Sequence, residues 1–129
     1  MAQIKVYGIK ENLNRIKSKL SDIIHSCVVE TLNLPMDKRF HRFFPLDRSD
    51  FFFPPDRSDN YTIIEISMFE GRSAEAKKQL IRLLFERIGK EMHISAQDIE
   101  ITISETPKHH WSIRGKPGDE LMLSYKVEM

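Results

Sequence analysis

The chain has 129 residues, of which 40% are hydrophobic and 30% charged, and its formal net charge is +1. This length predicts a single domain over residues 1–129, and the ordinary balance of apolar and charged residues excludes a disordered chain. The near-neutral charge gives no electrostatic basis for binding nucleic acid or an anionic membrane surface.

The start of the chain does not resemble a signal peptide, because no charged segment is followed there by an apolar one. No apolar run approaches the roughly 18 to 20 residues that a membrane span requires. The single cysteine, Cys27, cannot form an internal disulfide, and its position on a helical apolar face indicates a buried side chain and not a reactive thiol. We therefore expect a cytoplasmic protein.

The first part of the chain predicts a strand, a helix and a second strand. Apolar residues alternate over residues 3–9, and Asn12 is the expected N-cap of the helix that follows. Apolar residues then recur every three or four positions, which gives the helix one apolar face, and the helix is expected to end before Pro35. Residues 39–46 predict the second strand.

Residues 45–60 are expected to form a loop, since they contain three prolines and many polar turn formers. The tetrapeptide Asp-Arg-Ser-Asp occurs at 47–50 and again at 56–59, on either side of three consecutive phenylalanines. Phenylalanines in a loop require burial, either against their own subunit or against a neighbouring one. We interpret Phe51–Phe53 as contact residues and not as a cofactor site.

The second part of the chain repeats the order of strand, helix and strand. Residues 61–68 are rich in β-branched side chains and predict a strand, after which Ser73 is the expected N-cap of a second amphipathic helix. Residues 95–98 predict a tight turn. Clean alternation over residues 99–104 then predicts a strand with one buried face.

This order predicts an α/β (α+β) fold of two βαβ units, with a mixed four-stranded sheet and two helices on one face. Residues 121–127 predict a further short strand. The other face of the sheet would be uncovered and apolar, so we expect the subunits to associate.

Several motifs resemble the tautomerase superfamily, specifically its long-chain branch that includes malonate semialdehyde decarboxylase-like proteins. They are Ala-Gln-Ile-Lys-Val at 2–6, Ile-Ser-Met-Phe-Glu-Gly-Arg-Ser-Ala-Glu-Ala-Lys at 66–77, Ser-Ala-Gln-Asp-Ile at 95–99 and Glu-Thr-Pro-Lys-His-His-Trp-Ser-Ile-Arg-Gly at 105–115. The resemblance implies paired βαβ units that assemble as homotrimers. It also implies chemistry at an N-terminal proline, exposed after removal of the initiator methionine, with arginines that hold the carboxylate of a small oxo-acid.

Matched residue by residue, the family's catalytic proline falls on Ala2, so the catalytic position lacks its secondary amine. Arg72 matches an arginine at the start of the second helix, whereas Glu70 stands where the decarboxylase-like pattern has a second arginine. Trp111 matches a tryptophan of the active-site loop. Asp37 is a candidate for a carboxylate near the start of the second strand, with a shifted spacing.

Three of these residues are candidate substrate-binding groups, each with an alternative role. Arg72 lies beside a helix N-terminus and could fork onto a carboxylate, or it could be a surface arginine paired with Glu70 or Glu75. Arg114, next to a glycine, is a second anion-binding candidate or part of a loop salt bridge. Trp111 is a pocket wall or an interface anchor.

The functional alternatives are an enzyme, either an isomerase (an enol–keto tautomerase) or a lyase acting on a small oxo-acid, and a non-catalytic small-molecule binding protein on the same trimeric scaffold. A ferredoxin-like binding module is disfavoured by the weak net charge. The adjacent pair His109–His110 lacks the spacing of a metal site, so we expect no metal and no cofactor. The expected partners are further copies of the chain and a small carboxylate ligand, with neither nucleic acid nor membrane.

Overall fold

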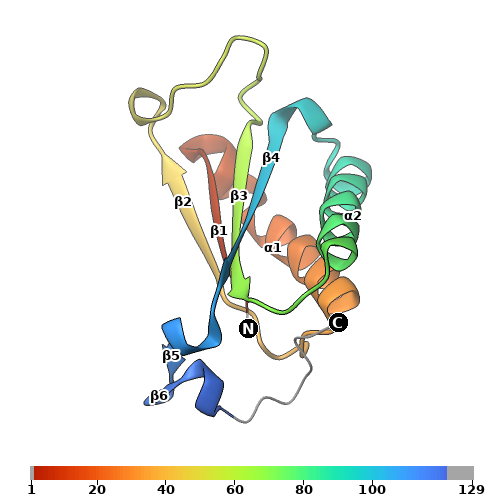
Figure 1. Ribbon diagram of the computed structural model, residues 1–129. Coiled ribbons are helices and arrows are strands. Elements are labelled where there is room, and N and C mark those ends of the chain that lie inside the picture. Colours follow the sequence, from red (N-terminus) through yellow and green to blue (C-terminus); the bar gives the residue numbers. More distant parts are fainter. Residues whose placement is uncertain (1, 122–129) are drawn as a thin grey trace.

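Two βαβ units follow each other along the chain, as predicted, in a computed structural model that describes residues 2–121 (Figure 1). Most of the strand expected at 121–127 lies outside the described residues. The helices and strands are β1 (Ala2–Ile9), α1 (Lys10–Leu32), β2 (His41–Leu46), β3 (Thr62–Phe69), α2 (Ala74–Met92), β4 (Ile99–Thr106), β5 (Ser112–Ile113) and β6 (Lys116–Pro117). Between residues 2 and 121, no helix combines the length and the apolar character needed to cross a membrane.

The four long strands form one mixed sheet in the order β2-β1-β3-β4. Strand β1 runs parallel to β2 and antiparallel to β3, and β3 runs parallel to β4. Both helices lie on the same side of this sheet (Figure 1). The predicted fold class and layer arrangement are therefore confirmed.

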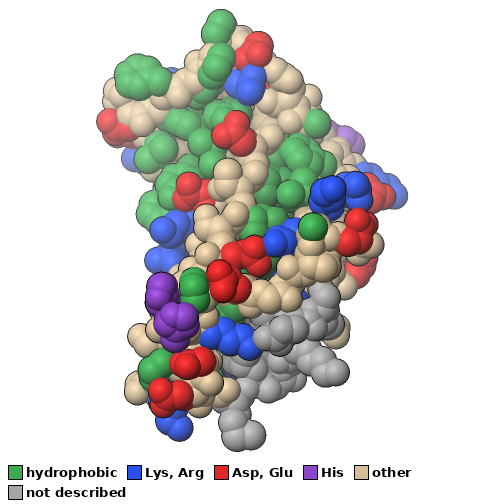
Figure 2. Space-filling view, in the orientation of Figure 1, with side chains coloured by type: hydrophobic (Ala, Val, Ile, Leu, Met, Phe, Trp, Pro, Cys, Tyr) green, Lys and Arg blue, Asp and Glu red, His purple; other side chains and the backbone are tan. Residues whose placement is uncertain are grey.

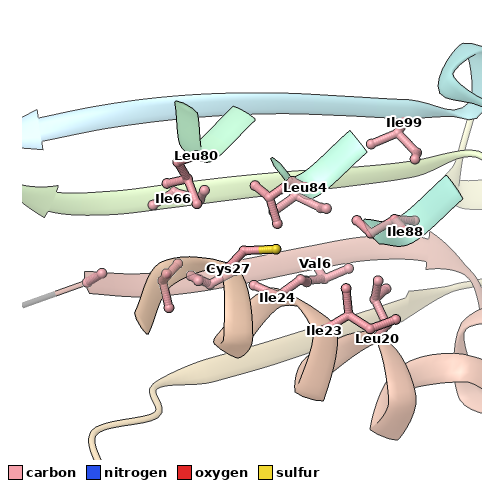
Figure 3. Packing of buried hydrophobic residues seen from close by; sticks show 14 of the residues in the cluster. Val6, Leu20, Ile23, Ile24, Cys27, Ile66, Leu80, Leu84, Ile88 and Ile99 are labelled. Carbon is pink, nitrogen blue, oxygen red and sulfur yellow. The ribbon is translucent and has the colours of Figure 1, made fainter. Parts of the chain in front are cut away.

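The core lies between the sheet and the two helices (Figure 3). Strands β1 and β3 have the same burial pattern, because alternate residues such as Val6 and Ile66 point toward the helices. Leu20 of α1 and Leu84 of α2 meet them and are completely buried. Burying an aliphatic side chain of this size stabilises the fold by about 1.5–3 kcal/mol. Cys27 belongs to the same cluster, and burial raises the pKa of its thiol, in agreement with a structural role.

The two helices begin in different ways. The prediction for α2 is confirmed, since Ser73 caps the helix by accepting a hydrogen bond from the Ala76 amide at 3.1 Å. The prediction for α1 is wrong, because the helix begins at Lys10 and its N-cap position is Ile9, which offers no side-chain cap. Asn12 is instead buried inside the first turn, where its carboxamide oxygen accepts a hydrogen bond from Arg15.

The uncovered face of the sheet is less apolar than the sequence suggested. Tyr7 donates a hydrogen bond to Glu65 at 2.7 Å and stacks on Phe44, with 4.9 Å between ring centroids. Arg42 donates to the side chain of Gln3 at 2.8 Å. Figure 2 shows hydrophobic side chains next to acidic and basic ones over the strands. This face therefore combines apolar contacts with directed polar ones.

The two copies of the Asp-Arg-Ser-Asp tetrapeptide bind each other and the end of the sheet. Arg48, from the first copy, donates two hydrogen bonds to the carboxylate of Asp59 in the second, at 2.9 and 2.6 Å. Ser58 donates its backbone amide and its hydroxyl to Asp98, at 2.7 and 2.6 Å. The loop between β2 and β3 is thus closed at its base and tied to the turn before β4.

The three phenylalanines of this loop separate into two environments. Phe51 and Phe53 contact the ring of Tyr61, with centroid distances of 5.6 and 5.3 Å. Phe52 points away from them and is 90% exposed. The sequence interpretation of contact residues within the subunit therefore holds for Phe51 and Phe53 only.

Candidate functional site

The candidate site lies at the sheet edge where β1 begins. Because β1 is antiparallel to β3 and β3 is parallel to β4, the start of β1 and the ends of β3 and β4 meet at this edge (Figure 1). Ala2 pairs with Met68, and Met68 pairs with Glu105 on its other side. Adjacent strands are about 4.8 Å apart, so Glu105 lies roughly 10 Å from Ala2 across the sheet. Ala2 itself is 8% exposed.

Trp111 reaches this edge through an aromatic contact. Its ring meets the buried ring of Phe69, the last residue of β3, edge to face at 5.1 Å. Gly118 permits this packing, because a Cβ there would lie 2.4 Å from the Lys108 carbonyl oxygen and 2.8 Å from that of Trp111. The loop after β4 is therefore folded back tightly beside the end of β3, with Trp111 as its inner side chain.

Arg114 lies in the turn between β5 and β6, a two-stranded hairpin that the sequence did not predict. Arg114 and Gly115 have φ values of +54° and +81°, as a tight turn with two left-handed residues requires. Arg114 is exposed and lines a recess of about 320 Å³ together with Lys116, Glu120 and Leu121.

Arg72 is a buried side chain that contacts the first βαβ unit. It is 6% exposed, and its Nη1 donates a hydrogen bond of 2.8 Å to the Leu32 carbonyl oxygen at the end of α1. It is therefore not a surface arginine, and Glu75, one of its two expected acidic partners, lies 3.6 Å from Arg82. Helix ends leave carbonyl oxygens without helical partners, and Arg72 satisfies one of them. It therefore links the second βαβ unit to the first.

The sequence analysis missed an ion pair at Glu105, the residue that lies in line with Ala2 and Met68 across the sheet. Lys77, in the first part of α2, places its Nζ 2.6 Å from Glu105 Oε1, and the two side chains are only 25% and 26% exposed. The inward alternation of Ile99, Ile101 and Ile103 continues to Glu105, and that pattern could have signalled a carboxylate on the helix side of the sheet.

The remaining sequence candidates lie at the surface. His109 and His110 are exposed and contact each other, with 4.4 Å between ring centroids. Asp37 occupies an exposed turn before β2. Over the described part of the chain, no three side chains of His, Cys, Asp or Glu gather as metal ligands.

Residues 38–114 match the protein family described as "Tautomerase enzyme", and the chain belongs to that family. The chain is 30% identical over 99 residues to the probable tautomerase YusQ of Bacillus subtilis (strain 168), a match that covers 73% of this chain and 78% of that protein. The family resemblance inferred from the motifs is therefore confirmed.

Solved structures of similar size share the fold. A structure of malonate semialdehyde decarboxylase superposes with a TM-score of 0.80 at 19% identity, covering 92% of this chain and 99% of that one. An asymmetric trimer of a fused 4-OT superposes with a TM-score of 0.78 at 19% identity, covering 91% of this chain and 96% of that one. These likenesses agree with the long-chain branch of the superfamily.

Proposed function

We propose that the chain binds a small 2-oxo acid at the sheet edge where β1 begins, and that it catalyses enol–keto conversion of such acids only weakly. The observation that carries this proposal is the place of Ala2, which is the first residue of β1 and pairs with Met68. The family resemblance puts the catalytic proline at this position. The strand that would position a terminal amine is thus in place, but alanine cannot supply the secondary amine that proline has.

An amine at Ala2 would still be chemically competent. Removal of Met1, which a small second residue such as alanine permits, leaves a primary amine with a reference pKa of about 7.7–8.0. Such an amine can accept a proton from a carbon next to a carbonyl, or form a Schiff base with the carbonyl itself. The family chemistry implied by the resemblance uses a secondary amine, and Ala2 can offer only a primary one. For this reason we expect slow turnover.

We propose that Arg72 and Arg114 bind the carboxylate of the acid and that Trp111 forms a wall of the pocket. Arg72 lies just after the end of β3, and its guanidinium is oriented by the Leu32 carbonyl. Arg114 stands in a turn beside Lys116, which adds a second positive charge to the recess there. Glu70 adds negative charge near the start of α2, so a monocarboxylate fits better than a dicarboxylate.

Binding of phenylpyruvate, measured by calorimetry, tests this proposal. We expect saturable binding, and we expect an Arg114→Asn variant to bind about tenfold to a hundredfold more weakly, because a charged hydrogen bond contributes about 1.5–3 kcal/mol. Asparagine tolerates the left-handed backbone at this position, so the change removes the cation alone. Arg82→Asn, on the exposed side of α2, is the matched control and should bind like the wild type. No binding by the wild type would reject the proposal.

The second candidate function is a non-catalytic binding protein on the same scaffold. It is favoured by two positions, Ala2 and Glu70, at which the chain departs from the catalytic pattern of the family resemblance. Saturable binding of phenylpyruvate with no enol–keto conversion above the buffer rate would select this candidate.

We further propose that the subunits form a homotrimer. A fused 4-OT of the same fold is a trimer, and one face of the sheet is left without a covering layer here. Phe52 adds an independent reason, since it is 90% exposed at the tip of a loop whose base is fixed by the Arg48–Asp59 ion pair. A rigidly presented aromatic side chain is typical of an interface anchor.

A Phe52→Ser variant is expected to dissociate at protein concentrations at least about tenfold higher than those at which the wild type dissociates, because an interface aromatic commonly contributes more than about 1–2 kcal/mol. Analytical ultracentrifugation over a dilution series measures the change. Asp50→Ser, also exposed in this loop, is the control and should leave assembly unchanged. A wild type that stays monomeric at micromolar concentration would refute the trimer, and equal dissociation of both variants would remove Phe52 from the interface.

A further inference from the structure

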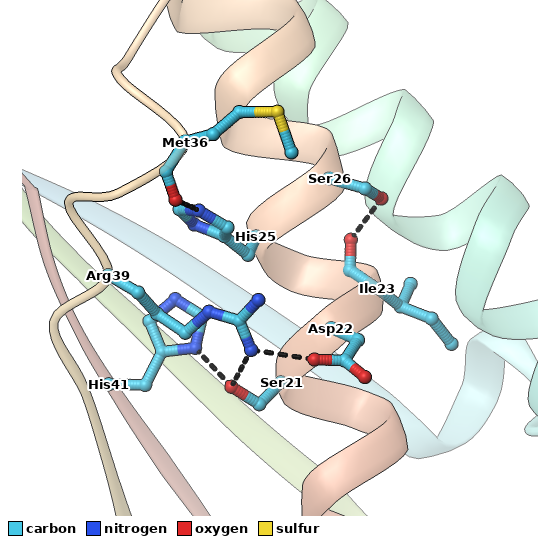
Figure 4. Close-up of polar contacts among 8 residues, drawn as sticks. All are labelled: Ser21, Asp22, Ile23, His25, Ser26, Met36, Arg39 and His41. Carbon is cyan, nitrogen blue, oxygen red and sulfur yellow. Dashed lines mark hydrogen bonds and ion pairs between the residues drawn. The ribbon is translucent and has the colours of Figure 1, made fainter.

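Two histidines face each other between α1 and β2, away from the candidate site (Figure 4). His25 belongs to α1 and is 3% exposed, whereas His41 is the first residue of β2 and points toward α1. Their rings meet edge to face, with 5.9 Å between centroids. The segment 33–40, which we call the connector, runs between the two elements that carry them.

The hydrogen bond of His25 determines which of its nitrogens carries the proton. Nε2 lies 2.7 Å from the Met36 carbonyl oxygen, and because a carbonyl can only accept, Nε2 must carry the hydrogen. Nδ1 is then a bare nitrogen, and it is buried without a hydrogen-bond partner. A second proton would place a charged N–H at a buried position where the described residues offer no acceptor, which is energetically costly.

His41 is also held as a neutral ring. Its Nδ1 lies 2.7 Å from Ser21 Oγ, and Arg39 donates a hydrogen bond of 3.4 Å to the same oxygen. A neutral Nδ1 without a hydrogen can accept the hydroxyl hydrogen of Ser21. Burial, together with the nearby His25 and Arg39, lowers the pKa of His41 from 6.5 to about 4.

The other charged groups around His41 do not offset this effect. Asp22 of α1 favours the protonated ring, but its carboxylate is engaged by Arg39 at 2.6 Å. On the other side, β1 places the apolar Ile4 opposite His41. The neighbouring pair of Lys5 and Arg42 projects to the opposite face of the sheet, since side chains alternate along strands.

Both histidines hold the connector. His25 binds it at Met36, near its middle, and His41 anchors its far end through Ser21. The Phe40 carbonyl oxygen accepts a hydrogen bond of 2.9 Å from the Ile4 amide, so the connector also sets where β2 joins β1. The His41 contact involves a ring whose charge changes in acidic solution.

We propose that His41, packed against His25, forms an acid-sensitive latch, which holds the connector against α1 when the His41 ring is neutral and releases it when that ring is protonated. For His41 the folded pKa lies below the value of 6.5 that applies when the ring is solvated. Its contribution is therefore complete above about pH 6.5 and is lost as the pH falls toward 4. Each pH unit below the solvated value, down to the folded pKa, should raise the opening constant about tenfold, because His41 is protonated only on opening.

Hydrogen exchange detected by mass spectrometry tests the latch. Between pH 6.5 and 4.5, after correction for intrinsic exchange rates, protection in residues 36–44 should fall about a hundredfold, while residues 62–69 of β3 should lose much less. The variant His25→Gln, His41→Asn keeps groups that can donate to Met36 and accept from Ser21 but cannot gain a proton. It should lose this pH dependence. His109→Gln, which changes an exposed histidine, should behave like the wild type.

Equal loss of protection in residues 36–44 and in β3 would mean global unfolding and would overturn the latch, as would a pH dependence that persists in the double variant. Should the double variant not fold, titration of the imidazole signals of the wild type by NMR decides. The His41 signal should then titrate well below 6.5, together with the connector amides. A His41 titration near 6.5 with unchanged connector amides would refute the proposal.

Discussion

An Ala2→Pro variant is expected to convert the enol of phenylpyruvate to its keto form at least about 100-fold faster than the wild type. A positioned general base contributes about 10²- to 10⁴-fold to such reactions, and proline at this position supplies the secondary amine that the family chemistry uses. The structure accommodates the change, because Ala2 is the first residue of β1, a position where a strand tolerates proline.

Mass spectrometry of each protein must accompany the rate measurements, since the chemistry requires that Met1 has been removed. Ala2→Ser, which keeps a primary amine, is the matched control and should stay close to the wild-type rate. A gain in the proline variant alone would identify the missing base as the cause of weak activity. A wild type that already turns over at rates usual for enzymes would contradict the proposed weak activity, and a proline variant that binds phenylpyruvate without any gain would contradict the assignment of Ala2 to the catalytic position.

An Arg72→Ala variant is expected to lose about 2–3 kcal/mol of unfolding free energy. The change removes a buried side chain and leaves the Leu32 carbonyl oxygen at the end of α1 without the hydrogen bond of 2.8 Å that it now accepts. A buried polar group without a partner costs about 1–3 kcal/mol, and the emptied space adds to this. Urea titration followed by circular dichroism measures the loss.

Arg82→Ala is the control for this change, because Arg82 is also on the second βαβ unit but is exposed, and its 3.6 Å contact with Glu75 should contribute within about 0.5 kcal/mol. Phenylpyruvate affinity, measured under conditions where both variants are folded, separates the two roles of Arg72. Weaker binding of the folded Arg72→Ala variant would support a role in holding the acid. Wild-type stability in this variant would contradict the structural role described here.

The local features of the fold could be predicted from the sequence, and the errors have local causes too. Ser73 was recognisable because a cap needs only a short polar side chain before an amphipathic run. Asn12 has the same chemistry, but β1 runs into α1 with only Ile9 as the boundary residue, so Asn12 falls inside the helix. The hairpin turn at Arg114-Gly115 was missed because arginine is not among the residues that usually mark a left-handed turn position.

The contacts missed at the candidate site and beyond it depend on residues far apart in the sequence. A helix N-terminus is usually solvated, and nothing near Arg72 in the sequence indicates that the end of α1, 40 residues earlier, covers it. The contact of His25 with His41 likewise requires knowing how α1 lies against β2. Periodicity assigns a residue to a face of its own element, but it does not say which other element that face meets.

The pairing of β1 with β3 in the middle of the sheet also determines how the fold responds to dilution. Seven residue pairs, from Ala2–Met68 to Gly8–Thr62, join the two βαβ units, and α1 packs on α2 beside them. Because the loop 47–61 makes both units part of one polypeptide, each unit meets the other at an effective concentration of the order of millimolar. Docking of the two halves is therefore a first-order process, and it proceeds equally well in a cell that holds few copies of the chain.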